Sequence, residues 1–247
     1  SKRDLSLCQP LLISPVFSSD NNAPVGNTLV DCTTTVRAIV PSANHKIFND
    51  EEARALIRSN FDKEVAIAYD SLAPCAYKAD LARYCILHEI GGWYFDIGMK
   101  AAGTQVDLQD EINLIAFREI NKYTFTNYAC SNCIIFAKPK NQALANAIEM
   151  IVENTKNKFY GVTPLCPTGP SLWGKAIAKS GIDKSIIFGD SIELTPGHQK
   201  KNKAMVLPDG AILAFTKQAG GGDLSALGAK GTNNYNEFWH QKRVYLT

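Results

Sequence analysis

The sequence predicts an α/β protein, and three observations lead to that prediction. Short apolar segments alternate with segments of helical periodicity along the 247 residues. Hydrophobic residues make up 45% of the chain and charged residues 20%, which is enough apolar material for a sizeable core. No internal repeat or linker divides the chain, so we predict a single domain over residues 1–247.

Each element has a local signal. Helices are predicted where apolar residues recur every three or four positions, at 50–58, 64–72, 77–90, 142–157 and 168–180. Asn49 or Asp50 can cap the first of these helices, and Gly91 and Gly92 end the third. Strands are predicted for the short apolar runs at 11–17, 93–95, 113–117, 133–137, 185–188 and 211–215. The glycine-rich segment 220–231 is predicted to be a loop.

Charge and hydropathy restrict the partners. The net charge is +2, from 26 basic and 24 acidic residues, which argues against a nucleic-acid-binding protein. The basic run at 199–203 is interpreted as a solvated loop, and its alternative role is to attract a phosphorylated acceptor at a membrane surface. No apolar run reaches the ~18–20 residues that span a bilayer, and no signal peptide is recognisable. We therefore expect a cytoplasmic protein with at most peripheral contact at the inner face of the membrane.

The cysteine pattern points to reduced thiols. The seven cysteines are odd in number and widely scattered, unlike a disulfide framework: Cys8, Cys32, Cys75, Cys85, Cys130, Cys133 and Cys166. Cys130 and Cys133 have CxxC spacing, but no second pair follows at the spacing of a zinc site. An apolar strand follows them instead of a helix, so a redox role is not expected.

Two polar features interrupt the apolar pattern. Asp80 and Arg83 are three residues apart on a predicted helix, so they share one face, with Tyr84 beside them. Asp96 ends the strand at 93–95, and ligands of α/β sheets bind beyond strand ends. A carboxylate there can hold a ribose hydroxyl or a divalent cation on a diphosphate. The alternatives are a surface ion pair for the first feature and a turn-forming Asp before Gly98 for the second.

Taken together, the stretches KADLARY (78–84) and ILHEIGGWYFDIG (86–98) resemble the DXD-containing sugar-binding region of glycosyltransferase family 32. Residues 132–140, the Thr168-Gly169-Pro170 helix start and the tail 231–245 are similar to bacterial capsule and lipopolysaccharide transferases. The resemblance covers residues 45–247 and implies a GT-A-like fold, with a mainly parallel sheet flanked by helices.

The resemblance also implies roles for individual residues. Asp80 would hold sugar hydroxyls of the donor, Arg83 would contact the diphosphate or the sugar, and Asp96 would contact the ribose and a metal. These three are the predicted catalytic residues. The rest of the predicted nucleotide-sugar site consists of Lys78, Tyr84, Asn233, Asn234, Tyr235 and Trp239. An alternative for Trp239 is that it pins the chain terminus to the core.

The third DXD position is occupied by Gly98, which has no side chain to coordinate a cation. A divalent cofactor, Mn2+ or Mg2+, is therefore expected to bind weakly at Asp96. The amides of Asn233, Asn234 and Asn236 are candidate replacement ligands.

The resulting functional prediction is a retaining glycosyltransferase. It would move a sugar from a UDP- or GDP-linked donor to a hydroxyl of a glycan or lipid-linked glycan, in surface polysaccharide biosynthesis. No Asp or Glu stands out as a catalytic base, which suits attack on the face that the diphosphate leaves. A pseudoenzyme that binds nucleotide sugars in a regulatory role is the alternative that Gly98 favours. A toxin-like transferase acting on protein side chains is a third interpretation.

Overall fold

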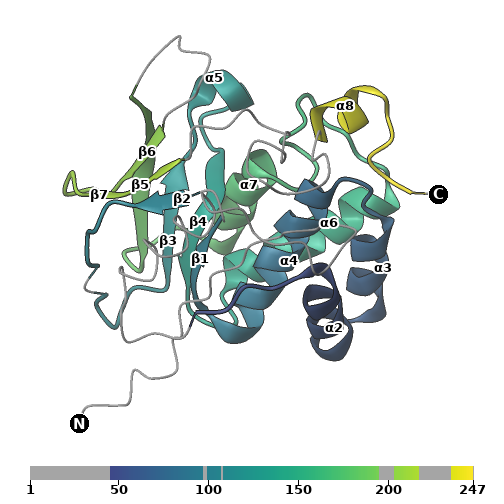
Figure 1. Ribbon diagram of the computed structural model, residues 1–247, viewed down its shortest axis with the longest axis horizontal. Coiled ribbons are helices and arrows are strands. Elements are labelled where there is room, and N and C mark those ends of the chain that lie inside the picture. The colour runs from purple at the N-terminus through teal and green to yellow at the C-terminus, as the bar shows by residue number, and fades with distance from the viewer. Residues whose placement is uncertain (1–44, 97–98, 107, 195–202, 217–234, 247) are drawn as a thin grey trace.

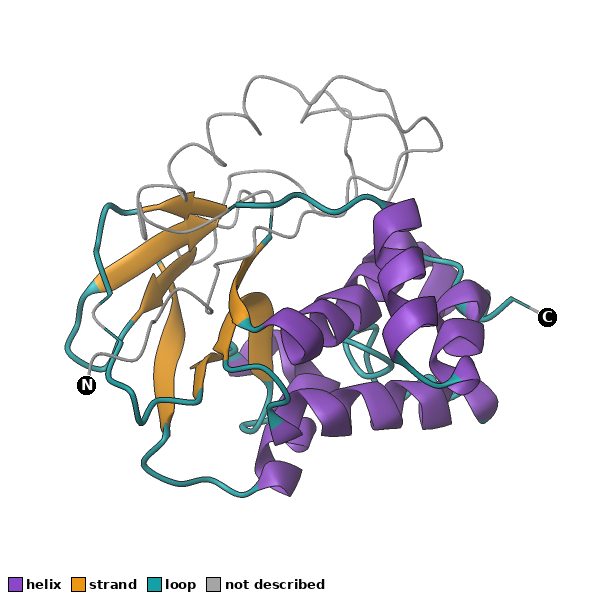
Figure 2. Ribbon diagram, turned by 90° about the horizontal axis from the view of Figure 1, so that it is seen from below, coloured by secondary structure: helices purple, strands orange, loops and turns teal. Residues whose placement is uncertain are grey.

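The computed structural model describes residues 45–96, 99–106, 108–194, 203–216 and 235–246. A layer of helices lies against one face of a β-sheet, and Figure 2 shows the two layers side by side. Figure 1 shows α2, α3 and α6 on the side of the molecule away from β6 and β7. Among the described residues, no helix has both the length and the apolar character needed to cross a membrane.

The helices follow the periodicity of the sequence closely. Their bounds are α2 (Asp50–Asn60), α3 (Lys63–Ser71), α4 (Cys75–Ile90), α5 (Asn121–Thr124), α6 (Gln142–Lys156), α7 (Pro170–Ser180) and α8 (Tyr235–His240). The five predicted helices are confirmed, and the short α5 and α8 were not predicted. Asn49 caps α2 by accepting from the Glu52 backbone N–H at 2.9 Å, while the Glu52 side chain accepts from the Asn49 backbone.

The seven strands form one sheet in the order β1-β4-β3-β5-β6-β7-β2. Their bounds are β1 (Gly92–Phe95), β2 (Met99–Ala101), β3 (Leu114–Arg118), β4 (Cys130–Ala137), β5 (Ile186–Glu193), β6 (Lys203–Val206) and β7 (Ile212–Thr216). Strands β2 and β6 were not predicted. The predicted strand at 11–17 and the predicted loop at 220–231 lie outside the described residues.

The prediction of a mainly parallel sheet was wrong. Only β3 and β5 pair in parallel, and every other strand pair in the described sheet is antiparallel. The reason is the length of the connections, because a parallel pair needs a long crossover. Strands β6 and β7 are joined by a tight turn in which Gly210 has φ +87°. The segment between β3 and β5 is long enough to contain α5, β4, α6 and α7.

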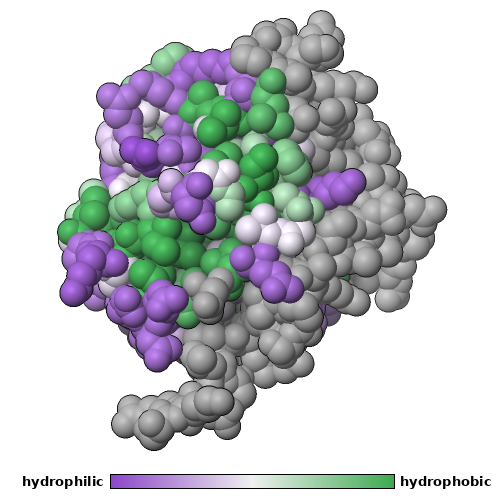
Figure 3. Space-filling model, turned by 90° about the vertical axis from the view of Figure 1, so that its left-hand side faces the viewer, coloured by the Kyte–Doolittle hydropathy of each residue, from purple (hydrophilic) through white to green (hydrophobic). Residues whose placement is uncertain are grey.

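The sheet is strongly curved. Its two edge strands are neighbours in sequence, because β1 ends at Phe95 and β2 begins at Met99. The backbone N–H of Met99 donates to the carbonyl of Asp96 at 2.9 Å. The face turned away from the helices encloses a second core that includes Trp93, Phe117 and Met205. Figure 3 shows that side of the molecule, where hydrophobic residues gather in the middle of the surface and hydrophilic ones surround them.

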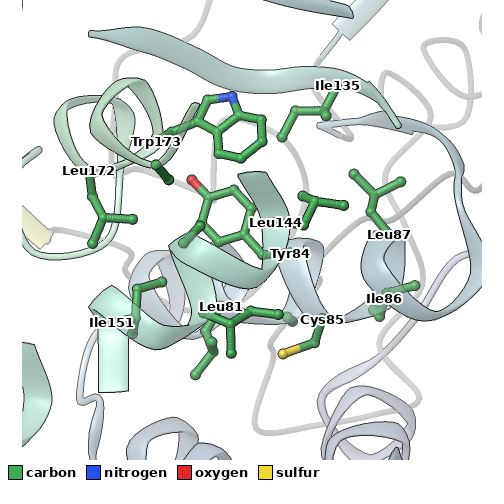
Figure 4. Close-up of a cluster of buried hydrophobic side chains, with 14 of the residues drawn as sticks. Leu81, Tyr84, Cys85, Ile86, Leu87, Ile135, Leu144, Ile151, Leu172 and Trp173 are labelled. Carbon is green, nitrogen blue, oxygen red and sulfur yellow. The ribbon is translucent and has the colours of Figure 1, made fainter. Parts of the chain in front are cut away.

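The larger core lies between the sheet and the helices. Helix α4 runs through it, and its residues from Ala79 to Leu87 are all buried. Figure 4 shows the ring of Tyr84 beside that of Trp173 from α7, and the two rings stack at 5.1 Å between centroids. Any polar side chain on this part of α4 must therefore find its partners inside the protein.

No disulfide joins any two of the described cysteines, which are Cys75, Cys85, Cys130, Cys133 and Cys166. Cys130 and Cys133 lie on the same strand, β4, rather than before a helix. Cys8, Cys32 and most of the basic run at 199–203 lie outside the residues that the structure describes.

Candidate functional site

Helix α4 places Asp80 and Arg83 one turn apart on the same face. Arg83 Nη2 lies 3.0 Å from Asp80 Oδ1, and the two side chains are only 6% and 10% exposed. The helix ends at Gly91, which has φ +72° and lies so close to Pro139 that a Cβ atom would be 2.4 Å from its Cδ. Only glycine fits that position, and it lets the chain turn directly into β1. The burial excludes a surface ion pair.

The second carboxylate lies where β1 ends. The backbone N–H of Asp96 donates to the carbonyl of Cys133 at 2.8 Å, which continues the pairing between β1 and β4. Its Oδ1 accepts from Arg83 Nη1 at 3.1 Å and from the hydroxyl of Tyr94. The side chain of Asp96 is 38% exposed, so it faces solvent while Arg83 does not.

Arg83 therefore joins the two carboxylates from inside the protein. Its Nη1 also donates to the backbone carbonyl of Asn132, and its Nε donates to the carbonyl of Ala79 at 3.3 Å. The guanidinium lies over the Tyr94 ring, 4.6 Å from its centroid. Burial lowers the pKa of Arg83, but Asp96, Tyr94 and Asp80 together outweigh burial, and the net shift is upward. The guanidinium is a permanent positive charge.

Asp80 is held from three sides. Besides Arg83, its Oδ1 accepts from Asn132 Nδ2 at 2.8 Å, and its Oδ2 accepts from Thr168 Oγ1 at 2.7 Å. Burial raises the pKa of Asp80, while Arg83 and the hydrogen bonds from Thr168 and Asn132 oppose that rise. The net shift is upward, so Asp80 takes up a proton more readily than an exposed Asp does.

Tyr84 lies beneath these residues. It is fully buried; its hydroxyl donates to the backbone carbonyl of Thr168 at 3.3 Å and accepts from Asn132 Nδ2 at 3.0 Å. The stacking on Trp173 fixes its ring. Tyr84 thus supports the two residues that hold Asp80.

Two further predicted residues lie apart from the carboxylates. The ammonium of Lys78 lies over the ring of Tyr69 on α3, 5.3 Å from its centroid. Trp239 Nε1 donates to the backbone carbonyl of Tyr160 at 2.8 Å, so its indole pins the C-terminal segment to the core. That pinning was the alternative interpretation of Trp239.

Tyr235, at the start of α8, lies close to the site. Its ring packs against Tyr77 of α4, with 6.0 Å between centroids. Burial raises the pKa of Tyr235, and the charge of Asp80 adds to that rise. Of the predicted tail residues, Asn233 and Asn234 lie outside the described part of the chain.

A divalent cation would find few protein ligands here. Oδ1 of Asp96 is already used by Arg83 and Tyr94, which leaves Oδ2 as the acceptor that no described residue contacts. Gly98 is outside the described residues. Within the described ranges, no three His, Cys, Asp or Glu residues lie together as a metal site would require. The described residues therefore offer a cation one carboxylate oxygen.

The charges of the site do not cancel. Asp80 and Asp96 carry two negative charges, and Arg83 supplies one positive charge between them. The described site therefore has one net negative charge, and an anionic diphosphate would need an additional cation next to it.

Three residues of the site were not predicted: Asn132, Thr168 and Tyr94. Asn132 and Thr168 belong to segments that resemble the family, but no spacing rule brings them to Asp80. They are 52 and 88 residues from it in sequence. Tyr94 was assigned only to an apolar strand, and its position two residues before Asp96 was the available signal.

Comparison with known proteins finds similarity to glycosyltransferases. Residues 26–115 match the family model described as "Glycosyltransferase sugar-binding region containing DXD motif". That range includes Asp80, Arg83 and Asp96. An uncharacterized glycosyltransferase of Acanthamoeba polyphaga mimivirus is 33% identical over 97 residues, which are 38% of this chain and 37% of the viral protein. The chain thus spans little more than a third of the length of this curated relative.

One solved structure shares the fold. The structure described as PaToxG Glycosyltransferase is similar at a TM-score of 0.54 and 15% identity, over 70% of this chain and 69% of that chain. The catalytic domain of the alpha-toxin from Clostridium novyi is 10% identical, with a TM-score of 0.39 over 71% of this chain and 64% of that chain. The first likeness concerns the fold alone. The family model and the viral relative are similarities to glycosyltransferases over part of this chain.

Proposed function

We propose that this chain transfers a sugar from a nucleotide-sugar donor to a hydroxyl of a glycan or lipid-linked glycan, with retention of anomeric configuration, on a GT-A-like fold. The observation that carries the proposal is the chain of contacts from Asp80 through Arg83 to Asp96, where β1 ends. A family model described as a glycosyltransferase sugar-binding region covers all three residues. Surface polysaccharide biosynthesis is the process that the sequence resemblance favours.

In this proposal each carboxylate has one task. Asp80 accepts a hydrogen bond from a hydroxyl of the donor sugar, because among the described residues only Thr168 donates to its Oδ2. Asp96 directs its Oδ2 toward the ribose and the diphosphate. Arg83 orients both carboxylates. Since its donors point to protein acceptors, it acts on the donor chiefly through them.

The divalent cation is proposed to bind jointly to Asp96 and the donor diphosphate. Asp96 alone fits a cation poorly, so most of the ligands would come from the diphosphate oxygens. When bound, the cation would supply positive charge to the leaving diphosphate.

The chemical step needs no carboxylate base. The acceptor oxygen attacks the anomeric carbon on the face that the diphosphate leaves, and the bond from that carbon to the phosphate oxygen breaks. The proton of the acceptor hydroxyl passes to the departing phosphate oxygen. The protein's contribution is to bind the donor, orient it and stabilise the charge that develops.

Gly98 favours a second candidate function, a nucleotide-sugar-binding pseudoenzyme with a regulatory role. One experiment separates the two. Thermal shift and isothermal calorimetry with UDP-glucose, UDP-N-acetylglucosamine and GDP-mannose, each with and without Mn2+, would identify a donor. Release of the nucleoside diphosphate would then be measured on a panel of glycan acceptors. Turnover that is lost in Asp80→Asn supports the enzyme, binding without turnover supports the pseudoenzyme, and no binding contradicts both.

A further inference from the structure

We infer that Asn132 is a positioning residue that leaves Asp80 a single open acceptor position, on Oδ2, for one hydroxyl of the donor sugar. The inference rests on the proposed function, because it assumes that Asp80 faces a sugar. It also deepens that function, since it assigns Asp80 one hydroxyl rather than two.

The first step is the count of acceptor positions on Asp80. An ionised carboxylate has two acceptor positions on each oxygen. Oδ1 is occupied from both sides, because Asn132 Nδ2 donates to it at 2.8 Å and the positively charged Arg83 Nη2 lies 3.0 Å from it as an ion-pair partner. Oδ2 accepts from Thr168 Oγ1 at 2.7 Å and from no other described residue. One position, on Oδ2, is left.

The second step is that Asn132 fixes the carboxylate plane. Its carboxamide donates to both Asp80 and the hydroxyl of Tyr84, while its backbone carbonyl accepts from Arg83. A single residue of β4 thus contacts three side chains of α4, and it is itself only 7% exposed. Rotation of the Asp80 carboxylate would break the Asn132 and Thr168 hydrogen bonds together, so Oδ2 stays in place.

The third step concerns what the arrangement recognises. A fixed acceptor with one vacant position binds one hydroxyl in one direction, and loss of that hydroxyl from the ligand leaves a buried carboxylate partly unpaired. Asn132 should therefore affect the binding of the sugar and not that of the nucleoside diphosphate, which lies toward Asp96.

The test uses the full chain and whichever of UDP-glucose, UDP-N-acetylglucosamine and GDP-mannose binds the wild type. Calorimetry would give the affinity of the nucleotide sugar and of the matching UDP or GDP. Asn132→Ala should lower the affinity for the nucleotide sugar about tenfold or more, because it removes a hydrogen bond to a charged group. It should leave the affinity for UDP or GDP unchanged. Asn132→Asp keeps the shape but removes the donor, so it should weaken the sugar at least as much.

A matched control comes from Asn146, which is also buried and whose Nδ2 donates to the backbone carbonyl of Ala176 at 3.1 Å, between α6 and α7. Asn146→Ala should lower the melting temperature without changing the affinity for the nucleotide sugar. Combining Asp80→Asn with Asn132→Ala should give no further loss beyond Asp80→Asn alone, because Asn132 acts through Asp80.

Three results would overturn the inference: equal weakening of the nucleotide sugar and of UDP or GDP, unchanged binding in Asn132→Asp, or additive losses in the double variant. If Asn132→Ala does not fold, the isosteric Asn132→Asp carries the same comparison. A wild type that binds UDP or GDP but none of the three donors would instead refute the proposed function, and this inference with it.

Discussion

The hydroxyl of Thr168 donates a hydrogen bond to Asp80 Oδ2, with 2.7 Å between the two oxygens, although the residues are 88 positions apart in sequence. This bond connects the start of α7 to the middle of α4. It holds the oxygen that we assign to the donor sugar, so the orientation of Asp80 depends on a segment far from the matched family region.

The first prediction follows from that bond. Thr168→Val removes the hydroxyl but keeps the branched shape, and it should weaken the nucleotide sugar by about 10- to 100-fold, the range for a hydrogen bond to a charged group. Thr168→Ser keeps the hydroxyl and should bind nearly as the wild type does. Calorimetry measures both variants, and equal affinities for Ser and Val would contradict a role for the hydroxyl.

The second prediction concerns the stability that Arg83 provides. Arg83→Met leaves Asp80 buried without its charge partner, which should cost about 3–5 kcal/mol in the free energy of unfolding. Arg58→Met is the control, because the Arg58 side chain is 60% exposed in its pair with Asp70. An exposed pair of this kind contributes about 0.2–1 kcal/mol. Urea unfolding of both variants measures the difference. Similar losses in the free energy of unfolding would show that the Arg83 pair contributes no more than an exposed ion pair.

The third prediction is a pH dependence of donor binding. Burial raises the pKa of Asp80. The ionised carboxylate is the form that accepts a hydrogen bond from a sugar hydroxyl, because it has both an open acceptor position and a negative charge. Donor affinity should therefore be full at high pH and fall as the pH drops through the raised pKa, at a higher pH than an exposed Asp would give. Titration calorimetry across pH measures the midpoint. Asp80→Asn should bind weakly with no such transition, and the same transition in that variant would assign it to another group.

The fourth prediction concerns metal. The Asp96 side chain offers one carboxylate oxygen that no described residue uses, and Gly98 has no side chain. The protein without nucleotide should therefore bind Mn2+ weakly or not at all. Binding should become measurable when UDP or GDP is present, because the diphosphate oxygens supply the missing charge. Gly98→Asp should strengthen binding of Mn2+ to the protein without nucleotide. Asp96→Asn should abolish the binding of Mn2+ that UDP or GDP makes measurable. Tight binding of Mn2+ by the wild type alone would mean that other ligands complete the site.

The sequence predicted the site best where a single helix or strand determines the position of a residue. Asp80 and Arg83 share a helical face by spacing alone, and Asp96 marks a strand end, so the three charged residues could be predicted before their contacts were known. Asn132 and Thr168 could not, because their roles arise from pairings between β4, α4 and α7 that are distant in sequence. The prediction of a mainly parallel sheet was wrong for a similar reason. Periodicity identifies strands, whereas the lengths of the connections decide how they pair.

The curvature of the sheet has a kinetic consequence. Asp96 lies between two edge strands whose partners are far along the chain: β1 pairs with β4, and β2 pairs with β7. Contacts of such long sequence separation form slowly, because the closure of large loops comes before any energetic gain. Helix α4, whose backbone hydrogen bonds are local, can form early with Asp80 and Arg83 already on it. We therefore expect Asp96 to reach its final place after α4 has formed, when β1 has paired with β4 and β2 with β7.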